Sequence, residues 1–172
     1  MVVLVKIRNQ LRVKSLEYAG CRVGTTYAQR YVIAVSPRRE GAMADIDELK
    51  AAFEHHIHMV NTHDLDAFIA TVYDGVAGFL IASPFPVDGQ EVIRQSLQTM
   101  LANTESNTFT PINPQFRVIG TTGLVWSHHV VARKPKDGPR TTVFGRSTFT
   151  FVKTDGQWLC VSFHHSFLPS GM

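Results

Sequence analysis

Four consecutive segments with two-residue periodicity constrain the fold of this chain more than any other feature. After Asn107, apolar and polar side chains alternate, and short connections carrying glycine, proline or aspartate separate the segments. A period of two is typical of a β-strand with one buried face. Asp155 and Gly156 lie between two such runs and form a strong signal for a two-residue hairpin. The sequence therefore predicts antiparallel strands over residues 116–120, 124–134, 141–153 and 157–167.

Helical patterns precede these strands. A first helix is predicted from Ala44, with Asp45 as its N-cap, because five apolar residues recur at helical spacing: Ile46, Leu49, Phe53, Ile57 and Val60. A short second helix should start at Asp64 or Asp66, and a third should cover residues 87–104. An apolar strand between them ends at the prolines of residues 84–86. Helices followed by an antiparallel sheet predict an α+β domain, with the sheet packed on three helices.

The positive charge of the chain is concentrated near its start. Residues 1–42 hold eight basic and two acidic residues, a net charge of +6, whereas the remainder carries −3. We therefore divide the chain into a basic leader, residues 1–43, which we expect to lie outside the fold, and a domain over residues 44–172. The leader is compatible with an organellar transit peptide, or with an upstream extension before a start at Met43.

Composition narrows the classes of partner. A nucleic-acid partner is not expected, because the predicted domain has no basic face. A membrane partner is not expected either, since no apolar run reaches the roughly 18 residues of a spanning helix. Cys21 and Cys160 fit neither a disulfide framework nor a zinc motif, so we expect no metal, no cofactor and a soluble protein in the reducing cytoplasm.

Strand periodicity predicts which side chains face inward. In the last strand, Leu159, Val161, Phe163 and His165 form the more apolar set, so His165 should point inward and His164 outward. In residues 124–134 the set with Leu124 and Trp126 is the larger, which places His128 inside and His129 outside. In residues 141–153, Phe149 and Phe151 should face the helices, unless Gly145 marks a bulge that reverses the preceding parity.

The inward histidines suggest a small-molecule site. His56 lies at the edge of the first helix's apolar stripe, and with His128 and His165 it forms a candidate catalytic or binding trio. Each could instead be a satisfied core histidine. The expected ligand pocket comprises Phe53, Phe79, Trp126, Ser147, Phe149 and Phe163.

The outward side of the last two strands is partly apolar. Phe144 falls on this side by strict alternation, and so do three residues of the last strand: Trp158, Cys160 and His164. Exposed apolar surface of this kind often marks an interface, although scattered apolar residues are also ordinary on protein surfaces. We therefore predict a homodimer across this face.

The order of elements and three stretches, THDLDAF, PFPVDGQEVI and STFTFVKTDGQWLCVSFHHSFLP, resemble the nuclear-transport-factor-two-like superfamily, and its SnoaL-like branch most. The resemblance covers residues 44–169. It implies a cone-shaped curved sheet wrapped on a long helix, with a cavity between them and dimers that pair sheet faces. The final stretch is also similar to the association domain of calmodulin-dependent kinase. The pocket arginines of that domain align with His128, Phe149 and His165, so they are not carried over.

The resemblance to ketosteroid isomerase gives a sharper expectation. That chemistry uses a carboxylate base together with a tyrosine and a second aspartate, which its apolar surroundings keep protonated. The matching positions here are His56 for the tyrosine and Ser83 and Ser147 for the two acids, so isomerisation of that kind is not expected. Three functions stay open: a domain that binds a small apolar or aromatic molecule, a small isomerase, cyclase or dehydratase that uses a pocket histidine, and an oligomerisation domain with a filled interior.

Overall fold

The computed structural model describes residues 41–81 and 83–168. Three helices come first, interrupted by two strands, and four long strands follow. The elements are α1 (Gly41–Thr62), α2 (Leu65–Ala70), β1 (Val72–Phe79), β2 (Pro86–Asp88), α3 (Gln90–Ala102), β3 (Thr104–Ile119), β4 (Thr122–Pro135), β5 (Thr141–Thr154) and β6 (Gln157–Phe167). The leader predicted over residues 1–43 lies almost entirely outside this range, so the domain boundary stays a prediction.

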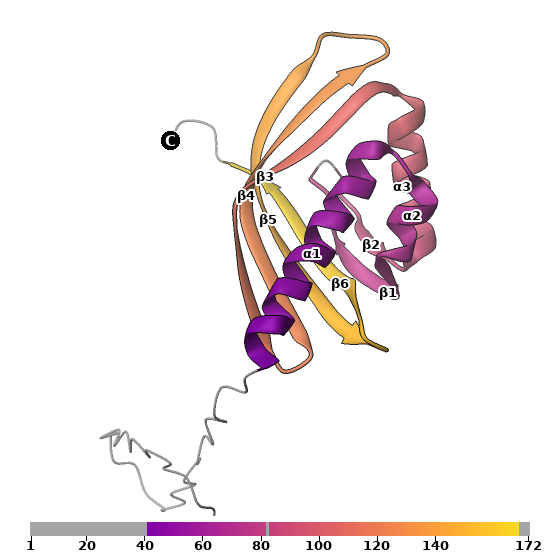
Figure 1. Cartoon of the computed structure of the whole chain (residues 1–172). Helices are drawn as coiled ribbons and strands as arrows, with labels where there is room; N and C mark the ends of the chain where they lie inside the picture. Colours follow the sequence, from indigo (N-terminus) through magenta and orange to yellow (C-terminus); the bar gives the residue numbers. More distant parts are fainter. Residues whose placement is uncertain (1–40, 82, 169–172) are drawn as a thin grey trace, which may run out of the picture. The chain divides into compact units, whose positions relative to one another are not determined.

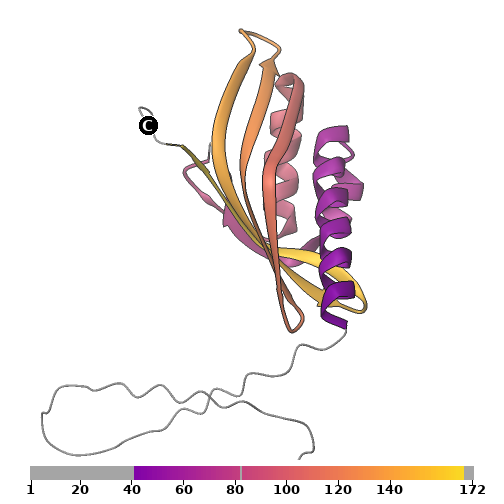
Figure 2. The same cartoon turned by 60° about the vertical axis from the view of Figure 1, so that its left-hand side comes forward.

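One curved sheet of six strands forms the wall of the domain, and the helices lie on one of its faces (Figure 1). The strand order is β2-β1-β6-β5-β4-β3. The turned view shows the long strands on one side and the helices on the other (Figure 2). The predicted α+β class is confirmed. One feature was not predicted, because β1 pairs with β6 in parallel, whereas the other neighbouring pairs are antiparallel.

Both edges of the sheet carry prolines. β3 forms one edge and contains Pro111 and Pro114, with a register shift between Ile112 and Gln115. β2 forms the other edge and begins at Pro86. Proline lacks the N–H that a central strand needs, so it is tolerated at edges and bulges. These prolines also make the edges poor templates for pairing with another strand.

Helix α1 packs against the sheet through the apolar stripe that the sequence predicts. Leu49, Phe53 and Ile57 are buried, and the ring of Phe53 meets those of Phe149 and Phe151 edge to face at 5.3 and 6.5 Å. The predicted N-cap is wrong, because α1 already begins at Gly41. Asp45 instead lies within the helix, where it and Glu48 accept hydrogen bonds from Lys153 of β5. Asp64 caps α2, as predicted, by accepting from the Ala67 amide.

A bulge in β6 corrects the predicted facing of its first half. Thr150 pairs with Ser162 but Phe151 pairs with Cys160, so Val161 is an extra residue. An extra residue reverses the alternation on one side of it. Trp158 and Cys160 are therefore buried, at 6% and 0% exposure, whereas they were predicted to face a dimer partner. Beyond the bulge Phe163 is buried and His164 is exposed, as predicted.

The inward set of β5 follows strict alternation through Gly145, Ser147, Phe149 and Phe151, all of them buried. No bulge occurs at Gly145, and Phe144 is 57% exposed on the outer side. Among the described residues, no helix is long and apolar enough to span a membrane.

Candidate functional site

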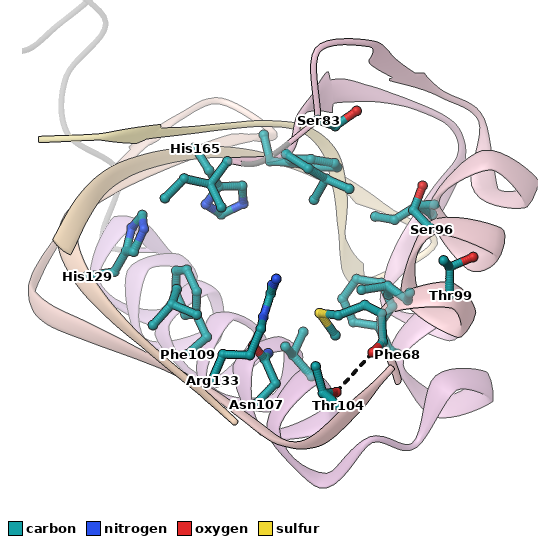
Figure 3. Close-up of a pocket in the computed structure, with 18 of the residues that line it drawn as sticks. Phe68, Ser83, Ser96, Thr99, Thr104, Asn107, Phe109, His129, Arg133 and His165 are labelled. Carbon is teal, nitrogen blue, oxygen red and sulfur yellow. Dashed lines mark hydrogen bonds between the residues drawn. The ribbon is translucent and has the colours of Figure 1, made fainter. Parts of the chain in front are cut away.

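A cavity of about 950 Å³ lies between the helices and the inner face of the sheet. Segments far apart in the sequence line it together, from α1, α2 and α3, from β3 to β6, and from the loop that follows β1 (Figure 3). Its volume lies at the upper end of the range of about 300–1,000 Å³ for small-molecule sites. The curvature of the sheet keeps this space open, because the helices cover the sheet without filling its hollow.

Most of the lining is apolar. Four phenylalanines contribute, together with aliphatic side chains from the helices, β4 and the loop after β1: Phe68, Phe109, Phe149, Phe163, Ile57, Val60, Leu80, Ile81, Val92, Ile93, Leu97, Met100 and Val131. Polar groups are fewer, and the main ones are His56, His129, His165, Asn107 and Arg133. Among the described lining residues Arg133 is the sole one with a full charge at neutral pH, and none is aspartate or glutamate.

His129 lies on the inner face of β4 with 1% exposure. Its ring stacks obliquely on that of Phe109, with centroids 4.6 Å apart. Gly145 stands opposite it on β5, and a side chain there would collide with the imidazole. Neither ring nitrogen of His129 has a hydrogen-bond partner among the described residues. Burial, with a smaller contribution from neighbouring His128, lowers its pKa, so the ring is neutral at physiological pH.

His165 lies beside His129, with ring centroids 5.6 Å apart. Burial lowers its pKa to about 3, and repulsion from His129, His56 and His164 contributes further. Its Nδ1 is buried without a hydrogen-bond partner among the described residues. Two adjacent neutral imidazoles therefore line the cavity with unused donor and acceptor capacity, which is costly in an apolar interior.

His56 differs from this pair because its hydrogen bonding fixes its tautomer. Its Nδ1 lies 2.7 Å from the Thr71 hydroxyl oxygen, and that hydroxyl donates to the Phe68 carbonyl at 2.7 Å. The hydroxyl proton is thus used, so His56 must donate from Nδ1 and carry its lone pair on Nε2. Burial lowers the pKa of His56 to about 3, with His55 contributing less.

Arg133 lies two inward positions beyond His129 on β4 and points into the open centre of the cavity (Figure 3). Its Nε donates to the side-chain oxygen of Asn107, its partner on β3, at 3.2 Å. Within the described part of the chain no carboxylate pairs with Arg133. The remaining guanidinium donors are therefore free to meet another acceptor.

The structure brings together four of the residues predicted for the site. His56, His165, Phe149 and Phe163 all line the cavity. Phe53 is buried in the core beside Phe149 and is not part of the lining, and Ser147 is buried with its hydroxyl 3.2 Å from that of Ser127.

Three predicted residues lie on the opposite face of the sheet. His128 is exposed there, Trp126 is 39% exposed with Arg117 over its ring, and Phe79 packs against His164. The prediction that His128 and Trp126 face inward is wrong. The indole of Trp126 lies on the outer face instead, where Arg117 partly covers it. Consequently Val125, Ser127, His129 and Val131 turn inward.

Sequence reasoning missed His129, Arg133 and Asn107. One change of parity accounts for two of them, because His129 and Arg133 share an inward set with the β-branched Val125 and Val131. Those valines were the signal that could have shown the correct inward set of β4. The prediction followed the larger Trp126 instead.

Two catalytic classes find little support in the described lining. The resemblance to ketosteroid isomerase matched Ser83 and Ser147 to its two acids, and the described lining of the cavity holds no carboxylate base in their place. Ser83 instead bonds within its own loop, to the backbone of Phe85. Among the described residues no group of three or more His, Cys, Asp or Glu side chains could hold a metal ion.

A curved sheet with helices over one face is the fold of solved structures that are described as NTF2-like. More narrowly, the chain belongs to the SnoaL-like domain family, whose model matches residues 49–170. The resemblance inferred from the sequence is thereby confirmed. No curated protein matches the sequence.

Solved structures share the fold at low sequence identity. A protein from Streptomyces avermitilis, provisionally described as a dehydratase of the NTF2-like family, is 20% identical with a TM-score of 0.66, over 75% of this chain and 99% of that one. A provisionally described aromatic ring hydroxylase from Novosphingobium aromaticivorans is 22% identical with a TM-score of 0.68, over 74% and 91%. A calcium/calmodulin-dependent kinase association domain from Xanthomonas campestris, also provisional, is 18% identical with a TM-score of 0.64, over 72% and 87%.

Proposed function

We propose that this domain binds a small, largely apolar or aromatic molecule in its cavity. The observation that carries the proposal is the combination of a roughly 950 Å³ space, four lining phenylalanines and three histidines in a lining whose described residues are mostly apolar. A concave apolar site with a few convergent polar groups is the usual form of a small-molecule pocket. The volume favours this function over an oligomerisation domain with a filled interior.

The polar contacts of the bound molecule would come from a trio that differs from the predicted one. His129 replaces His128, so the set becomes His56, His129 and His165. His129 and His165 can hydrogen-bond a ligand hydroxyl or carbonyl group, because their ring nitrogens have unused capacity. His56 already uses Nδ1 on Thr71, so only Nε2 can serve a ligand.

An enzymatic function is the second candidate, and the neutral histidine pair favours it. A dehydratase or cyclase must move a proton to or from carbon and oxygen, and imidazole can do both. Two of the structural neighbours carry provisional descriptions as dehydratase and hydroxylase. An enzyme of this kind requires that replacing His56, His129 or His165 by alanine reduces turnover of an accepted substrate. If none of the three substitutions changes turnover, an enzyme that uses one of these histidines is ruled out.

We also propose a homodimer that pairs the outer faces of two sheets. Large apolar side chains exposed on the described strands of this face include Phe79, Ile112, Trp126 and Phe144. Ile112 and Trp126 line a hollow of about 700 Å³ there. His128, Arg146 and His164 line the same hollow. Of the residues that the sequence predicts for the dimer face, Phe144 and His164 lie there, whereas Trp158 and Cys160 are buried. We propose the cytoplasm as the compartment, because Cys21 and Cys160 lie too far apart in the sequence to suggest a disulfide framework.

Thermal shift of the full chain against steroids, aromatic polyketides and aromatic acids tests the binding function. A ligand of the folded state raises the melting temperature as its concentration exceeds its dissociation constant. We expect at least one class to stabilise the protein, and the shift to be lost in a His129→Ala/His165→Ala variant. His58→Ala serves as the control, because His58 is exposed on α1. No shift across the whole panel, or a shift that survives the double variant, would contradict the proposal.

A further inference from the structure

We infer that the molecule bound in this cavity is an anion, an aromatic compound whose carboxylate or equivalent acidic group is held by Arg133. The inference rests on the proposed binding function and adds the chemical class of the ligand. The first observation is the charge of the cavity lining. Among the described lining residues, only Arg133 is ionised at neutral pH. The resemblance to the kinase association domain gave no reason to expect a cation at this position.

Arg133 is available to a bound anion, because no carboxylate among the described residues pairs with it. Its single hydrogen bond within the described residues runs from Nε to Asn107, which holds the plane of the guanidinium and leaves the outer nitrogens unused. The nearest acidic residue along β3, Glu105, is paired with Lys134 instead. A planar guanidinium with two parallel N–H groups matches a carboxylate in bidentate geometry. The apolar walls around it would strengthen that pairing.

The charge of the adjacent hairpin has the same sign. Four of the eight residues from Arg133 to Arg140 are basic and one is acidic. Pro135 and Thr141, which flank the tip of this hairpin, both line the cavity. An excess of positive charge beside the cavity raises the local concentration of anions and their rate of association.

The position of the histidine pair sets the length of the ligand. His129 and Arg133 lie on the same face of β4, four residues apart, so their Cα atoms are separated by about 13 Å. Figure 3 shows Arg133 extending into the centre and His129 and His165 on the wall away from Ser96 and Thr99. Between these polar ends lie Val131 of β4 and its partner on β3, Phe109. A rigid aromatic acid with a hydroxyl or carbonyl group at its far end fits this order of contacts.

Titration calorimetry of the full chain tests the inference with matched probes. The probes are 6-hydroxy-2-naphthoic acid, its uncharged amide 6-hydroxy-2-naphthamide, and 2-naphthoic acid, which lacks the hydroxyl group. We expect the acid to bind at least about tenfold more tightly than the amide. Arg133→Gln should remove that preference, and Arg133→Lys should restore part of it. Arg140→Gln makes the same change of charge on the hairpin outside the lining and should preserve the preference.

The outcomes separate the two proposals. Equal binding of acid and amide, or a preference that survives Arg133→Gln, overturns the anion inference and leaves the binding function standing. Absence of binding by all three probes contradicts both. In His165→Phe, the hydroxylated acid should bind no more tightly than 2-naphthoic acid, while the acid should still bind more tightly than the amide. This result would support the placement of the ligand's hydroxyl group at the histidines and its carboxylate at Arg133. Thermal melts of each variant establish that it is folded before its affinity is compared.

Discussion

Gly145 and His129 face each other across β5 and β4, and a Cβ atom on Gly145 would stand 2.5 Å from Nε2 of His129. The glycine therefore creates the slot in which the imidazole lies. The same added carbon would approach the Ser166 carbonyl oxygen to 2.6 Å, so the neighbouring strand β6 cannot yield without moving its backbone. Three strands thus fix one histidine of the candidate site.

Gly145→Ala should destabilise the protein and perturb the cavity at His129. Forcing an extra carbon into a packed interior costs about 1–3 kcal/mol, and the imidazole would have to leave its slot. Urea unfolding measures the loss of stability. Gly75→Ala is the matched control, because a Cβ atom there meets nothing nearer than 3.4 Å. Equal effects of the two substitutions would show that Gly145 is not a packing constraint.

Thr71→Val should cost about 1–3 kcal/mol of unfolding free energy. The substitution keeps the side-chain volume but leaves the Nδ1–H of buried His56 without an acceptor. Thr71→Ser preserves the hydroxyl and should cost much less. A double-mutant cycle with His56→Phe tests the pairing, because Thr71→Val should be nearly harmless once the imidazole is gone. Additive effects would contradict the hydrogen bond between Thr71 and His56.

Stability should fall as the pH is lowered from about 6.5 towards 3. The folded-state pKa values of His56 and His165 are depressed to about 3, so the unfolded chain binds these protons first. Each group then contributes a slope of up to about 1.4 kcal/mol per pH unit inside that window, and none above it. Urea unfolding from pH 7.5 to 4.5 gives the slope. His56→Phe should flatten it, and an unchanged slope would contradict the neutral buried state.

Lys153→Met should lower the melting temperature by loosening the start of α1 from β5. Hydrogen bonds from Lys153 to Glu48 and Asp45 raise the pKa of its ammonium group, so the charged form is the one held in the folded state. Because these groups are partly exposed, salt should screen their attraction. The difference from the unmodified chain should therefore shrink in 1 M NaCl, a salt concentration at which the screening length is about 3 Å. Lys136→Met, on an exposed residue, is the control.

Trp126→Glu should weaken the proposed dimer. A buried carboxylate in the middle of an apolar contact is strongly unfavourable. Sedimentation equilibrium of the two proteins measures the dissociation constant, which should rise by at least about tenfold. Met43→Glu introduces the same charge on α1, at a residue that is 77% exposed on the helix side of the sheet, and should leave association unchanged. A protein that is monomeric at every concentration would remove the dimer from the proposal.

The sequence was sufficient where local chemistry decides the structure. Asp155 and Gly156 both adopt positive φ, as a two-residue hairpin demands, and the turn joins β5 to β6 where predicted. The stripe of Leu49, Phe53 and Ile57 likewise follows from helical spacing alone. The α+β class and the family follow from such local signals taken in order.

The candidate site was predicted only in part, because it depends on parity and on distant pairing. Adjacent histidines at positions 128 and 129 must face opposite sides of β4, and the choice was made on the size of Trp126, which the outer face accommodates. The extra residue Val161 is visible only once β6 is paired with β5. Arg133 lies on the same face of β4 as His129. The wrong choice of inward face for β4 therefore left Arg133 out of the predicted site as well.

The position of β6 within the sheet has a consequence for how the domain is made. β6 follows every other element in the chain, yet it lies between β1 and β5, near the middle of the sheet. During synthesis, β1 has no neighbour on that side until the whole stretch from β2 to β5 has been added. Such long-range pairing is slow to form and leaves strand edges open in the meantime. The wall that carries His165 is therefore assembled last, and the nascent chain has to be protected from aggregation until that strand inserts.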